Sequence, residues 1–240
     1  MLLLGHRGAA GPHHPENTLA SVERALQQGA DGVEVDVRTS SDGRLVCCHD
    51  PDLRRTAGDP RQLVDVTAAD LDRVRISGHR LPPLAEVLDL VAGRGRLVVE
   101  VKRSPGSAWA IATALVTQLR AGVTGDVVVS SFDRPRLRAI GRAGLPVRTA
   151  LLSRPGVPLG LALRRALADS HDEAHVHVRS LLVRPELVVR AHELGLWVTA
   201  WTVDRPSALH RLAAAGVDAA ICDDPWAARI ALGQERTASK

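Results

Sequence analysis

Two short stretches of this sequence carry ionisable side chains at a spacing that could do chemistry. Glu34 and Asp36 are two residues apart, and so are Glu100 and Lys102. Both pairs lie in valine-rich runs, which favour β-strands. Because alternate residues of a strand point to the same face, each pair presents its two side chains together.

Three carboxylates are expected to converge if these two strands are neighbours. Glu34, Asp36 and Glu100 would then repel one another by about 4 kcal/mol per pair at 4 Å and an effective dielectric near 20. They need shared protons or a cation, and a divalent metal is the simplest solution. All-oxygen ligation suits Mg²⁺ or Ca²⁺ better than Zn²⁺. The sequence does not choose between Mg²⁺ and Ca²⁺.

Basic residues and histidines adjoin this acidic set. Arg7 and Lys102 would place positive charge beside the metal, and such a cluster suits a phosphate group. Cleavage of a phosphodiester needs a base and an acid that work near neutral pH, where histidine titrates. His6 ends the first predicted strand and His49 follows a predicted hairpin strand. We therefore predict that His6 and His49 are the acid and base.

The elements that must position these residues alternate along the chain. Short β-rich runs are followed by longer Ala-, Leu- and Arg-rich segments of helical period, the pattern of βα units and a parallel sheet. Strands are expected at residues 2–5, 32–37, 96–102, 126–131, 147–152, 174–178, 196–203 and 218–222. Helices are expected at residues 18–28, 108–121, 135–143, 159–170, 185–194, 206–215 and 225–232.

Eight repeats without a dinucleotide-binding glycine signature favour a closed TIM (β/α)₈ barrel over an open sheet. Residues 39–95 interrupt the rhythm and predict a small, partly helical insertion after the second strand, beginning with a hairpin partner at residues 45–48. We expect one domain over residues 1–232 and a flexible tail over residues 233–240.

Several residues taken together, and no single one of them, indicate a site at the strand ends. A Glu-x-Asp pair is often a solvated strand edge, and a lone histidine is often structural. Here, however, the acidic and basic residues fall at the ends of the first three barrel strands, where barrel enzymes carry their working residues. Asn17 is expected to cap the first helix. Either His175 or His177 could also reach the site, and the sequence does not decide which.

Composition excludes several classes of protein. The net charge is +4, but Lys102 and Lys240 are the only lysines and the arginines are scattered, which argues against nucleic acid. No apolar run is long enough for stable membrane insertion. The N-terminus lacks a basic region before its apolar residues, so we expect a cytoplasmic protein. Three cysteines are too few for a disulfide framework.

Several short motifs follow one another along the chain: His6-Arg7-Gly8, Pro15-Glu16-Asn17-Thr18, residues 29–37 and 42–46, His49-Asp50, Glu100-Val101-Lys102, Trp201-Thr202-Val203 and Gly216-Val217-Asp218. In these motifs and their order the sequence resembles the glycerophosphodiester phosphodiesterase family over nearly the whole chain. The resemblance implies a TIM barrel with a small subdomain inserted after the second strand. Asp204 and Cys222 depart from the more common Asn and Thr, which affects the expected shape of the substrate-facing rim.

Roles for individual residues also follow from the resemblance. It implies metal ligation by Glu34, Asp36 and Glu100, acid/base catalysis by His6 and His49, phosphate contacts from Arg7 and Lys102, and a place for Trp201 near the glycerol end of the substrate. The implied reaction is hydrolysis of small glycerophosphodiesters to glycerol 3-phosphate and an alcohol such as choline, ethanolamine or glycerol.

Two other functions stay open at this point. One is phospholipase D-like action on lysophospholipids, and the other is a phosphate-ligand binding barrel without turnover. The sequence also leaves open the preferred head group, the oligomeric state, and whether water or the glycerol hydroxyl of the substrate is the nucleophile.

Overall fold

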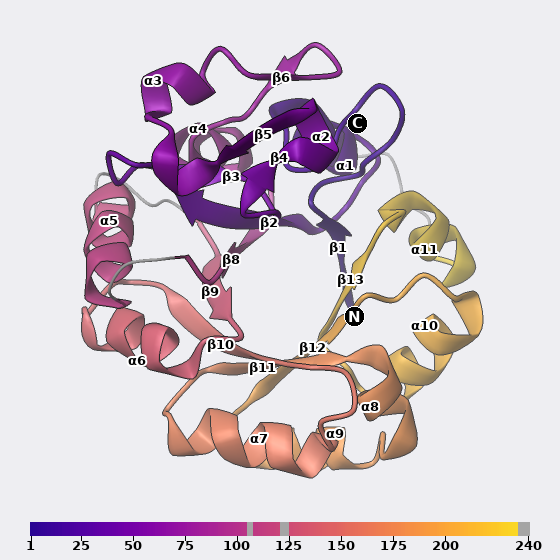
Figure 1. Cartoon of the computed structure of the whole chain (residues 1–240). Helices are drawn as coiled ribbons and strands as arrows, with labels where there is room; N and C mark the ends of the chain where they lie inside the picture. Colours follow the sequence, from indigo (N-terminus) through magenta and orange to yellow (C-terminus); the bar gives the residue numbers. More distant parts are fainter. Residues whose placement is uncertain (105–107, 121–124, 235–240) are drawn as a thin grey trace.

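Eight parallel strands close into a barrel in the structure, a computed structural model that describes residues 1–104, 108–120 and 125–234 (Figure 1). Around the barrel the order is β1, β13, β12, β11, β10, β9, β8 and β2, and pairing of β2 with β1 closes the ring. The strands are β1 (Leu2–His6), β2 (Gly32–Thr39), β8 (Arg96–Val101), β9 (Val127–Ser131), β10 (Arg148–Ser153), β11 (Glu173–His177), β12 (Trp197–Trp201) and β13 (Ala219–Cys222). The predicted TIM barrel is confirmed.

Helices surround the barrel on its outside (Figure 1). They are α1 (Leu19–Gln27), α4 (Leu84–Val91), α5 (Ala108–Arg120), α6 (Arg134–Arg142), α7 (Leu159–Ala168), α8 (Val178–Val183), α9 (Leu187–Glu193), α10 (Pro206–Ala214) and α11 (Pro225–Ala231). The valines of β2 that alternate with its acidic residues pack in the apolar layer between strands and helices. This alternation turns Glu34 and Asp36 to the barrel interior.

Helix α8 was not predicted, because residue 178 was assigned to the preceding strand. In the structure β11 ends at His177, whose side chain caps α8 by accepting a hydrogen bond from the backbone N–H of Arg179. Histidine is not a usual N-cap residue, so the pattern gave no start signal. Helix α4 falls inside the stretch that was predicted as an insertion, and it forms the crossover from the insertion to β8.

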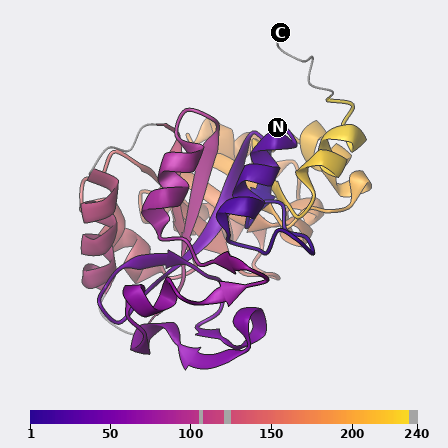
Figure 2. The ribbon, with the colours of Figure 1, turned by 90° about the horizontal axis from the view of Figure 1, so that it is seen from above.

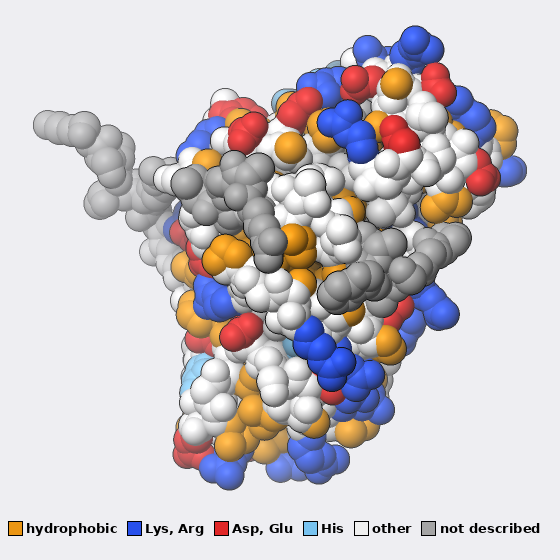
Figure 3. Space-filling view, turned by 90° about the vertical axis from the view of Figure 1, so that its left-hand side faces the viewer, with side chains coloured by type: hydrophobic (Ala, Val, Ile, Leu, Met, Phe, Trp, Pro, Cys, Tyr) orange, Lys and Arg blue, Asp and Glu red, His pale blue; other side chains and the backbone are white. Residues whose placement is uncertain are grey.

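The insertion between β2 and α4 packs around an apolar cluster of its own. It contains β3 (Leu45–Cys47), β4 (Asp52–Leu53), α2 (Arg54–Ala57), β5 (Asp59–Gln62), the 3₁₀ helix η1 (Leu63–Asp65), α3 (Ala68–Leu71), β6 (Arg75–Ile76) and β7 (His79–Arg80). As predicted, β3 pairs antiparallel with the end of β2. Leu53, Leu63 and Leu71 form the centre of this cluster. Figure 2 shows the insertion at one end of the barrel, and in Figure 3 basic and acidic side chains are interspersed over it.

An ion-pair network closes the opposite end of the barrel, where the strands begin. Arg96 lies 3.2 Å from Glu173 and 2.7 Å from Asp126, and its guanidinium carbon is 4.4 Å from the ring centre of Trp197. His175 is fully buried and its Nε2 is 3.1 Å from Glu173. His175 therefore belongs to this network and not to the strand-end site.

Two further expectations concern the ends of the chain and membranes. From residue 235 onward, the predicted tail lies outside the described residues. Among the residues that the structure describes, no helix has the length and apolar character needed to cross a bilayer.

Candidate active site

The three predicted carboxylates converge at the C-terminal ends of β2 and β8. These strands are parallel neighbours whose register pairs Asp36 with Glu100. One carboxylate oxygen from each of Glu34, Asp36 and Glu100 lies within 4.8 Å of the others, and all three residues are buried. Strand alternation and register alone therefore account for the acidic cluster.

Crowding changes the acidity of these groups. Burial, together with the negative charges of Asp36 and Glu100, raises the pKa of Glu34 to about 8. Burial and the charge of Asp36 also raise the pKa of Glu100. For Asp36, burial works in the same direction, but the positive charges of Lys102 and Arg7 outweigh it and the pKa is lowered. One carboxylate is thus kept ionised while its neighbours tend to hold protons.

Two cations lie against the cluster. The Nζ of Lys102 is 2.8 Å from Asp36 and 2.6 Å from Glu100. Arg7 places its Nε 3.1 Å from Asp36, and its backbone N–H donates to Glu34 over 3.1 Å. Arg7 has a φ of 55°, and Gly8 follows with a φ of 83°. A Cβ on Gly8 would lie 2.4 Å from the backbone of Ser21, so this turn needs glycine.

The cluster fits a hard divalent cation. Its donors are carboxylate oxygens, which Mg²⁺ and Ca²⁺ prefer. Glu34 Oε1 is buried and has no hydrogen-bond partner among the described residues. An unpaired buried carboxylate oxygen is costly unless a ligand satisfies it. A cation bound there would satisfy this oxygen and offset the repulsion among the three carboxylates.

Asn17 is a site residue that the sequence did not reveal, and its predicted role was wrong. The N-cap of α1 is Thr18, whose side chain accepts from the N–H of Ser21. Asn17, buried and with a φ of 59°, donates from Nδ2 to Asp36 Oδ2 over 2.9 Å. Its Oδ1 accepts from the backbone N–H of Asp36 over 2.9 Å. Asn17 therefore fixes the orientation of Asp36.

Each of the two predicted acid/base histidines has a carboxylate partner at Nδ1. His6 Nδ1 is 2.6 Å from Asp223, and His49 Nδ1 is 2.7 Å from Asp50. Burial lowers the pKa of His6, but the hydrogen bond to Asp223 and the negative charges of Glu34 and Asp223 together outweigh it, and the pKa is raised. For His49 burial dominates and the pKa is lowered. Both partners hold the ring through one nitrogen and leave Nε2 for chemistry.

Asp223 was also missed by the sequence analysis, although it directly follows β13. Its backbone N–H donates to Asp204 over 2.9 Å. Asp204 is one of the departures from the expected family pattern, and here it positions the partner of His6. The signal that could have identified Asp223 is its position directly after the last predicted strand, where a barrel enzyme can also carry a working residue.

A chain of alternating charges links the insertion to the barrel. Arg55 of α2 is 2.5 Å from Asp50 and 2.6 Å from Glu16. Glu16 in turn is 2.9 Å from Arg7. The segment that carries His49 is thereby tied to the loop that begins with Arg7, directly after His6 at the end of β1.

The aromatic side of the barrel mouth is formed by β11, β12 and the residue after β9. The ring of Trp201 meets His177 edge-on at 5.0 Å and Phe132 at 5.5 Å, measured between ring centres. Its Nε1 donates to the carbonyl of His175 over 3.3 Å. Of the two histidines on β11, His177 is the one at the mouth.

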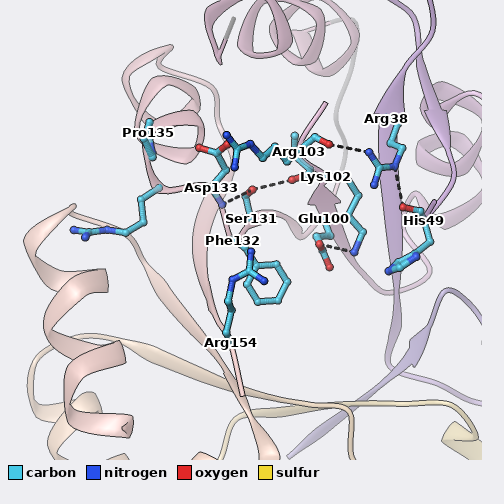
Figure 4. Close-up of a pocket in the computed structure, with 12 residues that line it drawn as sticks. Arg38, His49, Glu100, Lys102, Arg103, Ser131, Phe132, Asp133, Pro135 and Arg154 are labelled. Atoms are coloured by element: carbon cyan, nitrogen blue, oxygen red, sulfur yellow. Dashed lines mark hydrogen bonds and ion pairs between the residues drawn. The ribbon is translucent and has the colours of Figure 1, made fainter. Parts of the chain in front are cut away.

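A cavity of about 600 Å³ opens beside the acidic cluster (Figure 4). His49, Glu100 and Lys102 are among the residues that line it. The acidic cluster is therefore accessible to a small molecule, as expected for the catalytic end of a TIM barrel.

Comparison with known proteins decides the family. The model of the glycerophosphoryl diester phosphodiesterase family matches residues 6–227. The chain belongs to this family. The enzyme class expected from the sequence, a glycerophosphodiester phosphodiesterase, is thereby confirmed.

Individual members of the family match this chain over nearly its whole length. The glycerophosphodiester phosphodiesterase of Caldanaerobacter subterraneus is 32% identical over 237 residues, which cover 93% of this chain and 94% of that protein. A phosphodiesterase from Oleispira antarctica, solved in complex with the product sn-glycerol-3-phosphate, is 25% identical with a TM-score of 0.87 over 97% of each chain. The glycerophosphodiester phosphodiesterase of Thermotoga maritima is 25% identical with a TM-score of 0.80, covering 95% of this chain and 96% of that one.

Proposed function

We propose that this family member hydrolyses glycerophosphodiesters to glycerol 3-phosphate and an alcohol with the help of Mg²⁺ or Ca²⁺ held by Glu34, Asp36 and Glu100. The observation that carries this proposal is the set of three buried carboxylates whose oxygens lie within 4.8 Å of one another at an open cavity. The complex of the Oleispira antarctica phosphodiesterase with sn-glycerol-3-phosphate supports the choice of product. A cytoplasmic location stays a prediction.

Arg7 and Lys102 would bind the phosphate in this reaction. A bound divalent ion supplies Lewis acidity to the phosphodiester oxygens. Burial tends to lower the pKa of Lys102, but Asp36 and Glu100 raise it, so this ammonium stays charged. Both cations already lie at the carboxylates and can therefore neutralise charge that develops on the phosphoryl oxygens. We propose that Trp201 borders the glycerol end of the substrate.

His6 and His49 would move the protons. One histidine takes a proton from the attacking hydroxyl, of water or of the glycerol end of the substrate, and its oxygen forms a bond to phosphorus. The bond from phosphorus to the alcohol then breaks, and the other histidine donates a proton to the departing oxygen. If the glycerol hydroxyl attacks, the first product is a cyclic phosphate, which water then opens to glycerol 3-phosphate. The pKa values of the two rings are shifted in opposite directions, which is the expected pattern for an acid and a base that act at the same pH.

Turnover with and without metal tests the proposal. The purified protein is expected to release glycerol 3-phosphate from a mixture of glycerophosphodiesters, to lose this activity in EDTA, and to regain it with Mg²⁺ or Ca²⁺. Lysophosphatidylcholine is the control substrate and is expected to stay intact. Choline release from lysophosphatidylcholine alone would instead support phospholipase D-like action. Binding of glycerophosphodiesters without any product would support a barrel that only binds.

Asp223→Asn is expected to move one limb of the pH profile of kcat/KM to lower pH. The hydrogen bond to Asp223 raises the pKa of His6, so its loss lets burial lower that pKa. The measurement is kcat/KM from pH 5 to 9. Asp224→Asn is a matched control, since Asp224 caps α11 by accepting from Ala227 N–H. Identical profiles for wild type and Asp223→Asn would contradict a role for Asp223 in setting the protonation of His6.

A further inference from the structure

The cavity beside the acidic cluster is rich in arginines. Besides His49, Glu100 and Lys102, its lining includes Arg38, Arg103, Phe132, Asp133, Arg134 and Arg154 (Figure 4). Arg38 lies near the end of β2, whereas Arg103 and Arg154 follow β8 and β10. Arg134 begins α6, so four different elements bring these arginines to the same cavity. Trp201 is not among the described residues that line the cavity, but its ring contacts Phe132, which does line it.

Most of this positive charge is not neutralised by a carboxylate. Within the described part of the chain, neither Arg103 nor Arg154 has an acidic group within ion-pair distance. Arg38 donates hydrogen bonds to the backbone carbonyls of His49 and Arg103, both over 2.8 Å. Because these acceptors are uncharged, they do not neutralise its positive charge. Arg134 is the exception, because it pairs with Asp169 at 2.7 Å.

Asp133 is, with Glu100, one of two acidic residues among the described residues that line the cavity, and it does not pair with the arginines. The carboxylate of Asp133 caps α6 by accepting from the backbone N–H of Arg136 over 3.2 Å. Its charge is directed to the positive end of that helix. Among the described residues that line the cavity, Arg38, Arg103 and Arg154 are therefore three positive charges without a carboxylate ion-pair partner.

This lining is poorly suited to a quaternary ammonium group. Choline is usually recognised by open aromatic faces. Among the described residues that line the cavity, Phe132 is the only Phe or Trp, and the guanidinium carbon of Arg154 already lies 5.5 Å from its ring centre. A cationic head group would compete with Arg154 for that ring and would be repelled by the remaining arginines.

We propose that this cavity receives the leaving alcohol and selects glycerophosphodiesters whose alcohol carries a phosphate group of its own. Guanidinium groups bind phosphate through paired N–H donors, and Arg103 and Arg154 have such donors available. The proposal deepens the proposed function and rests on it, because it concerns the substrate class of the same site. Glycerol would occupy the Trp201 side of the phosphorus and the anionic alcohol the arginine side.

Three substrates of graded charge test this selectivity. Glycerophosphocholine has a cationic alcohol, glycerophosphoglycerol a neutral one, and deacylated cardiolipin an alcohol that carries a second phosphodiester. The kcat/KM for deacylated cardiolipin is expected to exceed that for glycerophosphoglycerol by about tenfold or more, since a hydrogen bond to a charged group is worth that much. Glycerophosphocholine is expected to be the slowest, and added salt should narrow the differences.

Arg154→Gln is expected to reduce the ratio of kcat/KM between deacylated cardiolipin and glycerophosphoglycerol, whereas Arg154→Lys should retain most of it. Arg164→Gln makes the same charge change on the exposed face of α7 and should leave the ratio as in wild type. Equal kcat/KM for all three substrates, or a preference for glycerophosphocholine, would overturn the inference while leaving the proposed function intact. No release of glycerol 3-phosphate from any of them would instead overturn the proposed function.

Discussion

Glu34→Gln is expected to abolish metal-dependent turnover and, at the same time, to stabilise the metal-free protein at pH 8. Burial and two neighbouring carboxylates raise the pKa of Glu34 to about 8, from an ordinary value of 4.5. The folded state therefore binds more protons than the unfolded state between these two values. The favourable contribution is fully present below pH 4.5 and is lost as pH rises through about 8. Glutamine has the same shape and does not ionise, so it removes this dependence.

The measurement is thermal unfolding in EDTA at several pH values between 5 and 8. The difference in melting temperature between Glu34→Gln and wild type should grow with pH. Glu193→Gln, a substitution on the exposed surface of α9, is the control and should follow wild type. A difference that is constant with pH would show that Glu34 is ionised throughout.

Metal binding provides a second readout for the same variant. Mg²⁺ or Ca²⁺ should raise the melting temperature of the wild type, because an ion that binds only the folded state stabilises it. Calorimetric titration at pH 7 in buffers of different ionisation enthalpy should show that a proton is released as the ion displaces it from Glu34. Glu34→Gln should show neither effect. Equal metal stabilisation of both proteins would place the ion elsewhere.

His6→Ala and His49→Ala are each expected to lower kcat by about 10² to 10⁴-fold at saturating metal. Each ring is held by a carboxylate at Nδ1 and sits at the rim of the acidic cluster. Because the two act in one reaction, the double variant should lose less than the product of the single losses. His13→Ala, in the exposed loop after β1, is the matched control. Retained turnover in both single variants would end the acid/base assignment.

A diester of glycerol 3-phosphate and 4-nitrophenol separates the two roles. Nitrophenolate leaves without being protonated, so loss of the general acid should cost little with this substrate. The variant that lacks the general base should stay slow with both substrates. If both variants are equally slow with the nitrophenyl diester, neither histidine protonates the alcohol.

The fold and the acidic cluster were predictable because each depends on a short repeat in the sequence. Alternation along β2 decides which side chains face inward, and the βα rhythm decides that β2 and β8 are neighbours despite the long insertion. The register that pairs Asp36 with Glu100 follows from both. A site that is formed by residues at strand ends can therefore be predicted from the sequence alone.

The missed residues depend on contacts that such repeats do not encode. Asn17 and Thr18 are both good N-cap residues, and only the left-handed backbone at Asn17 decides that Thr18 caps the helix. Asp223 meets His6 across 217 positions of sequence because β13 returns to β1 when the barrel closes. The arginines of the cavity likewise come from four different elements, near the ends of β2, β8 and β10 and at the start of α6, and they form no motif in the sequence.

The separate apolar cluster of the insertion has a consequence for how this protein can change. Leu53, Leu63 and Leu71 pack with one another and not with the layer beneath the barrel helices. Substitutions that reshape the insertion can thus shift His49 and the adjoining cavity wall while the strand-borne carboxylates keep their places. A different insertion can therefore give a different substrate preference, while the barrel strands keep the carboxylates that would hold the metal.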